Sequence, residues 1–160
     1  MRLKVMPTLA VRRPADLGEL HRERYAAMVR LATLLVGSQA VAEEVVQDCF
    51  VRLHTRFDGL DDPAAYLRRA VVNGCRSVGR RRALELRRLR AARPAVAELG
   101  ADEMLDALAK LPARQRAALV LRFYEELPAA QIALALGCRP GTVKSLIHRG
   151  LAELRKGLEP

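Results

Sequence analysis

The sequence predicts an all-α protein built from two small helical domains joined by a linker. Ala, Leu, Arg and Val dominate its 160 residues, a composition that favours packed helices over a sheet. Apolar residues recur at spacings of three and four, as they do along one face of a helix. Residues that favour turns, such as Gly37, Gly59, Pro63, Pro112 and Gly137, separate these periodic segments.

Charge and cysteine usage narrow the function classes. Lys and Arg number 28 against 18 Asp and Glu, and the net charge of +10 predicts a polyanionic partner such as nucleic acid. Cys49, Cys75 and Cys138 are odd in number, with no His at ligand spacing, so neither a disulfide scaffold nor a metal site is expected. Buried or idle thiols in a reducing cytoplasm are predicted instead.

No feature of the sequence indicates a membrane protein or an enzyme. The basic start of the chain has only a short apolar run, broken by Pro7, which predicts neither a signal peptide nor membrane insertion. No nucleophile elbow, H-E-x-x-H motif or glycine-rich phosphate loop is present, so no catalysis, cofactor or metal is expected.

Residues 1–15 are predicted to form a mobile basic arm, and residues 16–82 the first domain. Its first helix is expected over Leu17–Val36, and a second helix from about Gln39 to Phe57 after a break at Gly37. The second helix carries a polar patch whose carboxylates could serve acid–base chemistry or a metal, but no second cluster completes such a site. A solvated or partner-facing acidic patch is therefore expected. Its members are Glu43, Glu44, Gln47 and Asp48.

A turn at residues 58–62 leads into the third helix of this domain. Asp62 suits an N-cap and Pro63 the first helical position, and the helix is expected to end near Arg82. It presents Arg and Asn side chains and ends in an arginine run, which predicts contacts with phosphates, with a merely solvated face as the alternative.

A linker is predicted at 83–100, where the periodicity loosens, and a second domain at 101–160. A helix ending at Pro112 is followed by one from Ala113 to about Glu125, which is expected to bury Phe123 among other residues. A short helix closed by Gly137 and a longer helix opened by Pro140 complete the chain.

The last helix is strongly two-sided at 100° per residue. Val143, Ile147, Gly150 and the leucines that follow share one arc. The opposite arc is cationic and hydrogen-bonding, and such a face behind a tight turn suits the major groove of DNA. A solvated amphipathic helix is the alternative. The residues of this arc that are predicted to contact DNA are Lys144, Ser145, His148 and Arg149.

Three stretches together resemble a known family. The first is AEEVVQDCFVRL (42–53), which resembles the signature A-E-D-L-V-Q-E-x-F-L-R-L, and the second is DDPAAYLRRAVVNGCRSVGRRR (61–82). The third, residues 105–155, contains an L-P-x-R-Q-R element and a G-T-V-K-S…R-x-L-x-x-L-R element. In this order they resemble regions 2 and 4 of bacterial RNA polymerase sigma factors of the extracytoplasmic-function (ECF) group, above all its short actinobacterial members.

The resemblance implies a transcription initiation factor that binds core RNA polymerase, reads the −10 and −35 promoter elements and assists strand opening. The acidic patch would dock on the β′ clamp of the polymerase, the β flap would be a second contact, and the basic arc of the last helix would read the −35 element. An anti-sigma factor is a further partner that the family allows. The residues implied at the −10 element are Asp58, Gly59, Leu60, Asp61, Asp62, Arg69, Asn73, Arg76, Arg80, Arg81 and Arg82.

Two departures from the family and two alternatives remain at this point. Arg139 stands where a Ser-like cap is usual, at an expected cost of about 1 kcal/mol of helix stability. Leu146 stands where an Arg is common, which predicts a lost phosphate contact. A stand-alone helix-turn-helix regulator that does not require core polymerase would use residues 102–160 alone. A helical adaptor or small enzyme would carry its basic faces incidentally.

Overall fold

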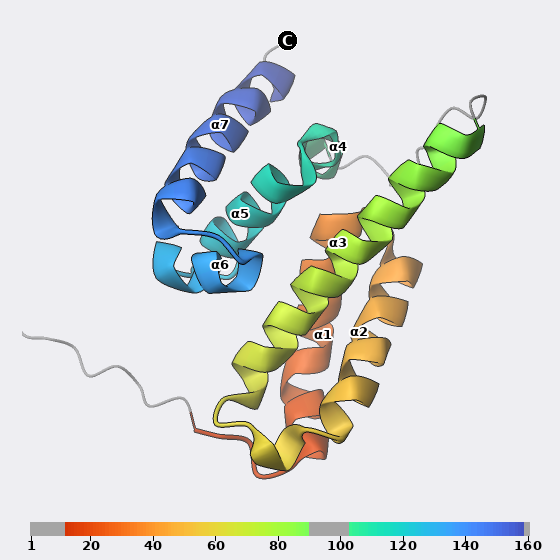
Figure 1. Cartoon of the computed structure of the whole chain (residues 1–160), viewed down its shortest axis with the longest axis vertical. Helices are drawn as coiled ribbons and strands as arrows, with labels where there is room; N and C mark the ends of the chain where they lie inside the picture. The colour runs from red at the N-terminus through yellow and green to blue at the C-terminus, as the bar shows by residue number, and fades with distance from the viewer. Residues whose placement is uncertain (1–11, 90–102, 159–160) are drawn as a thin grey trace, which may run out of the picture.

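The computed structural model describes residues 12–89 and 103–158, and all regular structure within these ranges is helical. The helices form two bundles that lie side by side, with the long helix α3 along their junction (Figure 1). The predicted all-α fold class is confirmed. Among the described helices, none combines the length and the apolar character needed to cross a bilayer.

The first bundle contains α1 (Leu17–Val36), α2 (Gln39–His54) and α3 (Pro63–Leu89). The carboxylate of Asp16 accepts a hydrogen bond from the backbone of Glu19 at 2.7 Å and so caps the start of α1. Gly37, with a left-handed φ of 74°, ends the helix. The bounds of α1 are those predicted from the sequence.

The other two helices of this bundle differ from the prediction at their C-terminal ends. The second helix ends at His54 rather than Phe57, because the chain tightens into the 3-10 helix η1 (Phe57–Gly59) and buries the Phe57 ring. The third helix continues to Leu89 rather than ending near Arg82, since the residues that follow Arg82 are good helix formers. The predicted linker residues beyond Leu89, up to residue 100, lie outside the described ranges.

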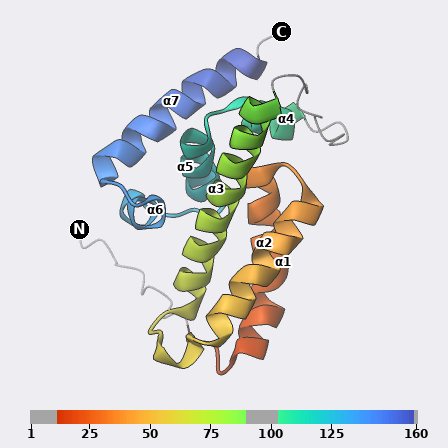
Figure 2. The ribbon, with the colours of Figure 1, turned by 45° about the vertical axis from the view of Figure 1, so that its right-hand side comes forward.

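The second bundle contains α4 (Glu103–Lys110), α5 (Ala113–Phe123), α6 (Ala129–Leu136) and α7 (Pro140–Leu158). The central helix is α5, which contacts α6 and α7 on one side and α1 of the first bundle on another (Figure 2). Its residues 117–121 are all buried. The sequence predicts Phe123 in the core, but this residue is the last of α5 and its side chain is 60% exposed.

The two bundles pack directly against each other, and their buried residues form one continuous cluster. Arg116 of α5 bonds to the C-terminal ends of two other helices. Its Nη1 donates to the carbonyl of Leu35 at the end of α1 at 2.6 Å, and its Nη2 donates to those of Ala109 and Leu111 at the end of α4 at 3.1 and 3.0 Å. A guanidinium at helix C-termini meets the negative ends of their dipoles. Burial lowers the pKa of Arg116 from its ordinary value.

An ion pair joins the bundles at a second point. Arg68 of α3 donates through Nε to Oε2 of Glu125 at 3.0 Å, with side chains only 18% and 11% exposed. Arg30 of α1 also donates to the hydroxyl of Tyr124 at 3.0 Å. These contacts fix the turn after α5 against the first bundle, a packing that the sequence did not predict.

Candidate nucleic-acid interface

The polar arc of α7 stands free of the core, as predicted. Lys144, Ser145, His148 and Arg149 are all exposed, while Val143 on the opposite arc is completely buried. The hydroxyl of Ser145 donates to the carbonyl of Gly141 at 3.2 Å, and Nε of Arg149 donates to that of Ser145 at 3.3 Å. The four side chains therefore form a continuous cationic and hydrogen-bonding surface on one helix. We call it the α7 face.

A close approach of two helices holds the α7 face in place. A Cβ added at Gly150 would lie 3.0 Å from Cδ1 of Leu119, so the absence of a side chain lets α7 lie directly against α5. The turn into α7 uses Gly137, whose φ of 61° favours glycine, and the amide of Cys138 donates back to the carbonyl of Ala133 at 3.0 Å. This is a helix-turn-helix.

Two positions near the turn depart from the family pattern. The carbonyl of Arg139 accepts hydrogen bonds from Thr142 and Val143 at 3.0 and 3.2 Å, so Arg139 occupies the N-cap position of α7. Leu146 is only 7% exposed. Its side chain packs in the core cluster, and the expectation that it removes a phosphate contact common in the family stays a prediction.

In the first bundle, a loop at residues 57–62 forms the end that joins α2 to α3. Phe57 points into the core, whereas Asp58, Gly59 and Asp61 are exposed and Leu60 is partly buried. The side chain of Asp62 serves the fold, since its Oδ1 accepts from the backbone of Ala65 at 3.0 Å and caps α3, as predicted. Because Asp62 caps the helix, only the exposed carboxylates of Asp58 and Asp61 in this loop are available to bind a ligand.

A groove of about 350 Å³ lies between α2 and α3, and we call it the α2–α3 groove. It brings Arg69, Asn73 and Arg81, which are implied at the −10 element, together with Asp48 of the acidic patch. The 57–62 loop does not line it. Asn73 lies ten residues along α3 from Pro63, roughly 15 Å at 1.5 Å per residue, so the loop and Asn73 present separate surfaces.

Three other α3 arginines implied at the −10 element face the second bundle. Arg76, Arg80 and Arg82 line a groove of about 790 Å³ between the bundles, together with Arg114 and Arg116. We call it the interbundle groove. Burial lowers the pKa of Arg76, and the positive charges of Arg114 and Arg80 lower it further. Nη1 of Arg76 donates to the carbonyl of Leu136 at 3.4 Å. The arginines implied at the −10 element are thus divided between two grooves.

The acidic patch follows one side of α2. Glu44, Gln47 and Asp48 are exposed, and Glu43 is partly buried and accepts from Nε2 of Gln39 at 3.0 Å. Sequence reasoning missed Val51, which is 70% exposed and follows Gln47 and Asp48 at helical spacing. Its position outside the apolar stripe of α2 was the available signal. The patch therefore combines carboxylates with an exposed apolar side chain, a mixture typical of protein contacts.

Two of the three thiols are buried, in line with the prediction of buried or idle cysteines. Cys49 and Cys75 are buried and free, and Cys138 is partly exposed. Burial raises the pKa of Cys49 to about 11 and that of Cys75 to about 12, so both are neutral at physiological pH. Within residues 12–89 and 103–158, no group of three or more His, Cys, Asp or Glu side chains is arranged to hold a metal ion.

Known proteins share this arrangement. The family model for sigma-70 region 2 matches residues 20–85, and that for sigma-70 region 4 matches residues 101–154. The chain is 35% identical over 150 residues to the RNA polymerase sigma-E factor of Streptomyces avermitilis, covering 88% of this chain and 84% of that protein. It is 31% identical over 154 residues to the ECF RNA polymerase sigma factor SigL of Mycobacterium tuberculosis, covering 88% and 87%.

A solved structure agrees with these relatives. The sigma factor RpoE of Bartonella quintana, in complex with the anti-sigma factor NepR, superimposes with a TM-score of 0.74 at 25% identity, covering 89% of this chain and 96% of that one. The region 2 match covers the first bundle, which a stand-alone helix-turn-helix regulator would not need, so that alternative is not favoured. The chain belongs to the ECF group of RNA polymerase sigma factors, which direct the polymerase to promoters.

Proposed function

We propose that the two bundles divide promoter reading between them, the second holding the −35 element as duplex and the first holding the −10 element as single strand. The observation that carries this proposal is the α7 face: four exposed polar side chains that lie on one helix, opposite a buried arc. A helix of this kind fits the major groove and can contact both base edges and phosphates.

At the −35 element, Lys144 and Arg149 supply positive charge to phosphates or to guanine edges. Ser145 and His148 add hydrogen bonds at neighbouring positions of the same face. The helix lies on α5 through the Gly150 contact, so its side chains meet DNA from a fixed platform.

At the −10 element, the α2–α3 groove and the 57–62 loop act on single-stranded DNA. The amide of Asn73 can donate to and accept from an unpaired base, and Arg69 and Arg81 lie beside it to hold the backbone. Unstacking a base costs a few kcal/mol, which contacts in the groove and neutralised phosphates offset. The carboxylates of Asp58 and Asp61 are exposed and would accept hydrogen bonds from base amino groups.

The bundles separate when both elements are bound. The −10 and −35 positions are roughly 85 Å apart along B-form DNA at about 3.4 Å per base pair. The longest helix, α3, has 27 residues, a length of only about 40 Å. Separation also frees Arg76 from the carbonyl of Leu136 and makes it available to the DNA backbone. Core polymerase holds the separated bundles in place, with its β′ clamp on the acidic patch and its β flap on the second bundle.

An anti-sigma factor is the second kind of partner that we propose. The Bartonella sigma factor described above is in complex with one. In this chain the interbundle groove has an apolar floor and five arginines, so it suits an amphipathic helix with acidic side chains. Binding there would hold the bundles together. We further propose that the protein works in the cytoplasm, with its polymerase, and acts by binding rather than by catalysis.

Co-purification with core polymerase from an actinobacterium tests the proposal at its base. The unchanged protein is expected to bind core polymerase, and Asp48→Arg to bind it much less, because a charge is reversed in the acidic patch. Glu23→Arg is the matched control, since Glu23 is an exposed carboxylate on another helix. Failure of the unchanged protein to bind core polymerase would overturn the proposed function.

The −35 assignment has its own test with duplex promoter DNA bound by the polymerase complex. Lys144→Glu is expected to weaken binding about tenfold or more, because a phosphate-facing cation becomes an anion. Lys156→Glu, on the last turn of the same helix, changes the same charge at a residue that pairs with Glu153 and is expected to do far less. Equal losses from the two substitutions would contradict the role of the α7 face.

A further inference from the structure

The guanidinium of Arg13 contacts Phe57, the first residue of the 57–62 loop. Nη2 of Arg13 donates to the carbonyl of Phe57 at 3.1 Å, and its guanidinium carbon lies 5.4 Å from the centroid of the Phe57 ring. The two residues are 44 positions apart in the sequence. Arg13 therefore holds both the main chain and the side chain of Phe57, by a charged hydrogen bond and a cation–π contact.

The buried Phe57 ring and the Asp62 cap hold the two ends of the loop, and there are few restraints between them. Its backbone is closed by two 3-10 hydrogen bonds, from Gly59 to the carbonyl of Arg56 at 3.1 Å and from Leu60 to that of Phe57 at 3.3 Å. The carbonyl of Phe57 thus accepts from Leu60 and from Arg13 together. Asp58, Gly59 and Asp61 are exposed. The Phe57 anchor therefore sets the direction in which the exposed loop residues point.

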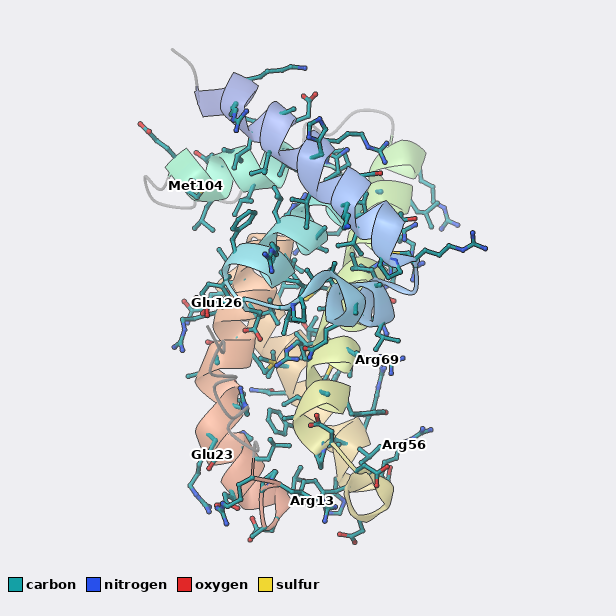
Figure 3. All side chains as sticks on the ribbon, turned by 90° about the vertical axis from the view of Figure 1, so that its left-hand side faces the viewer. Arg13, Glu23, Arg56, Arg69, Met104 and Glu126 are labelled. Carbon is teal, nitrogen blue, oxygen red and sulfur yellow. The ribbon has the colours of Figure 1, made fainter. Side chains whose placement is uncertain are left out.

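The segment before α1 lies along the same end of the bundle, where Figure 3 shows Arg13. Pro14 is buried, and Arg12 pairs with Glu19. A cavity of about 140 Å³ separates this segment from the start of α3, and Asp61 and Asp62 line it together with Arg13. Residues 12–14, which were predicted to belong to a mobile arm, thus pack next to the loop and line this cavity with it.

We infer that Arg13 is a positioning residue for the 57–62 loop, which it holds in the orientation that meets the −10 element. This inference rests on the proposed function of the loop. Arg13 acts through Phe57 and needs no contact with DNA. Without it, the exposed part of the loop is less well ordered, and the cost of ordering it on DNA is subtracted from the binding free energy.

The test uses the complex of this chain with core polymerase and a forked DNA whose single-stranded −10 segment is randomised, with bound sequences counted. Arg13→Ala is expected to weaken binding to this probe about tenfold, the loss of one charged hydrogen bond and one cation–π contact. It is also expected to flatten the base preferences in the −10 segment. Affinity for core polymerase and for −35 duplex is expected to stay unchanged.

Three further variants test whether Arg13 orients the loop or only stabilises the folded protein. Arg12→Ala removes the same charge from the same segment and is expected to keep the base preferences. Arg13→Lys restores a cation without the planar fork and is expected to recover part of them. Phe57→Leu keeps an apolar side chain but removes the ring. Combined with Arg13→Ala it is expected to add little to the change in base preferences, because Arg13→Ala already removes the cation–π contact.

The outcomes distinguish the inference from the function on which it rests. Base preferences that are the same in Arg13→Ala as in Arg12→Ala would overturn the inference and leave the proposed function standing. A fall in melting temperature with unaltered base preferences would also overturn it, since Arg13 would then only stabilise the bundle. If the complex with the unchanged chain shows no preference in the −10 segment, the proposed function of the first bundle fails instead.

Discussion

The α7 face and the 57–62 loop are both proposed to read promoter DNA, but they are held in place differently. The α7 face lies on one helix, and a nearby glycine contact with α5 fixes its orientation. The loop depends on Arg13, which precedes it by 44 residues. A surface on a helix is positioned by its own periodicity and one packing contact, whereas a surface on a loop needs a distant side chain.

The largest effect is expected where the α7 platform itself is disturbed. Gly150→Leu would push α7 away from Leu119 and is expected to lower the free energy of unfolding by about 3 kcal/mol. It should abolish −35 binding and leave the −10 surface of the first bundle active on forked DNA. Gly157→Leu is the control, because a Cβ at Gly157 meets no atom within 4 Å. Denaturant unfolding and binding assays measure both.

A smaller effect is expected at the junction of the two bundles. Glu125→Gln leaves the largely buried Arg68 without its ionic partner and is expected to cost about 2 kcal/mol. The bundles should separate more easily, which small-angle X-ray scattering would detect as a larger radius of gyration. Glu126→Gln changes a neighbouring exposed residue and should do neither. An unchanged radius in Glu125→Gln would show that the pair does not hold the bundles together.

Alkaline pH is expected to weaken the first bundle in particular. The pKa of Cys49 is raised to about 11 and that of Cys75 to about 12, so the folded state keeps protons that the unfolded thiols lose from pH 9 upward. The stability contributed by the neutral thiols is complete below pH 9 and is lost as pH rises through about 11 to 12. The loss at pH 10 is about 1 kcal/mol for each thiol. Unfolding at pH 8 and pH 10 measures the loss, and Cys75→Ala should reduce this pH dependence.

The smallest effect concerns the start of α7. Arg139→Ser supplies a side-chain acceptor at the N-cap and is expected to stabilise the protein by about 1 kcal/mol. Arg139→Ala offers no acceptor and is the control. Thermal unfolding of both variants measures the difference, and equal melting temperatures would show that the cap position is already satisfied.

Local sequence signals predicted the helices and the α7 face well. The Asp16 cap and Gly37 bound α1 where periodicity placed it, and Val143 and Lys144 fall on the predicted sides of α7. Each of these signals acts within a few residues of the chain, so the sequence alone contains it.

Contacts between distant segments could not be predicted. The spacing of Arg13 and Phe57 in the sequence gives no sign of their contact. Arg116 is part of the L-P-x-R-Q-R element, but the sequence does not show that it joins α5 to α1 and α4. Arg76 and Asn73 are three residues apart on α3 and were assigned to one DNA element, but they line different grooves. Their separation depends on how α2 and the second bundle pack on either side of α3.

Footprinting of the complex with core polymerase on a promoter that it transcribes tests the division between the bundles most directly. Two protected segments, centred near −10 and −35, are expected. Lys144→Glu should lose the upstream segment alone, and Arg13→Ala should weaken only the downstream one. A single protected segment, or loss of both segments from either substitution, would contradict the assignment of the two promoter elements to separate bundles.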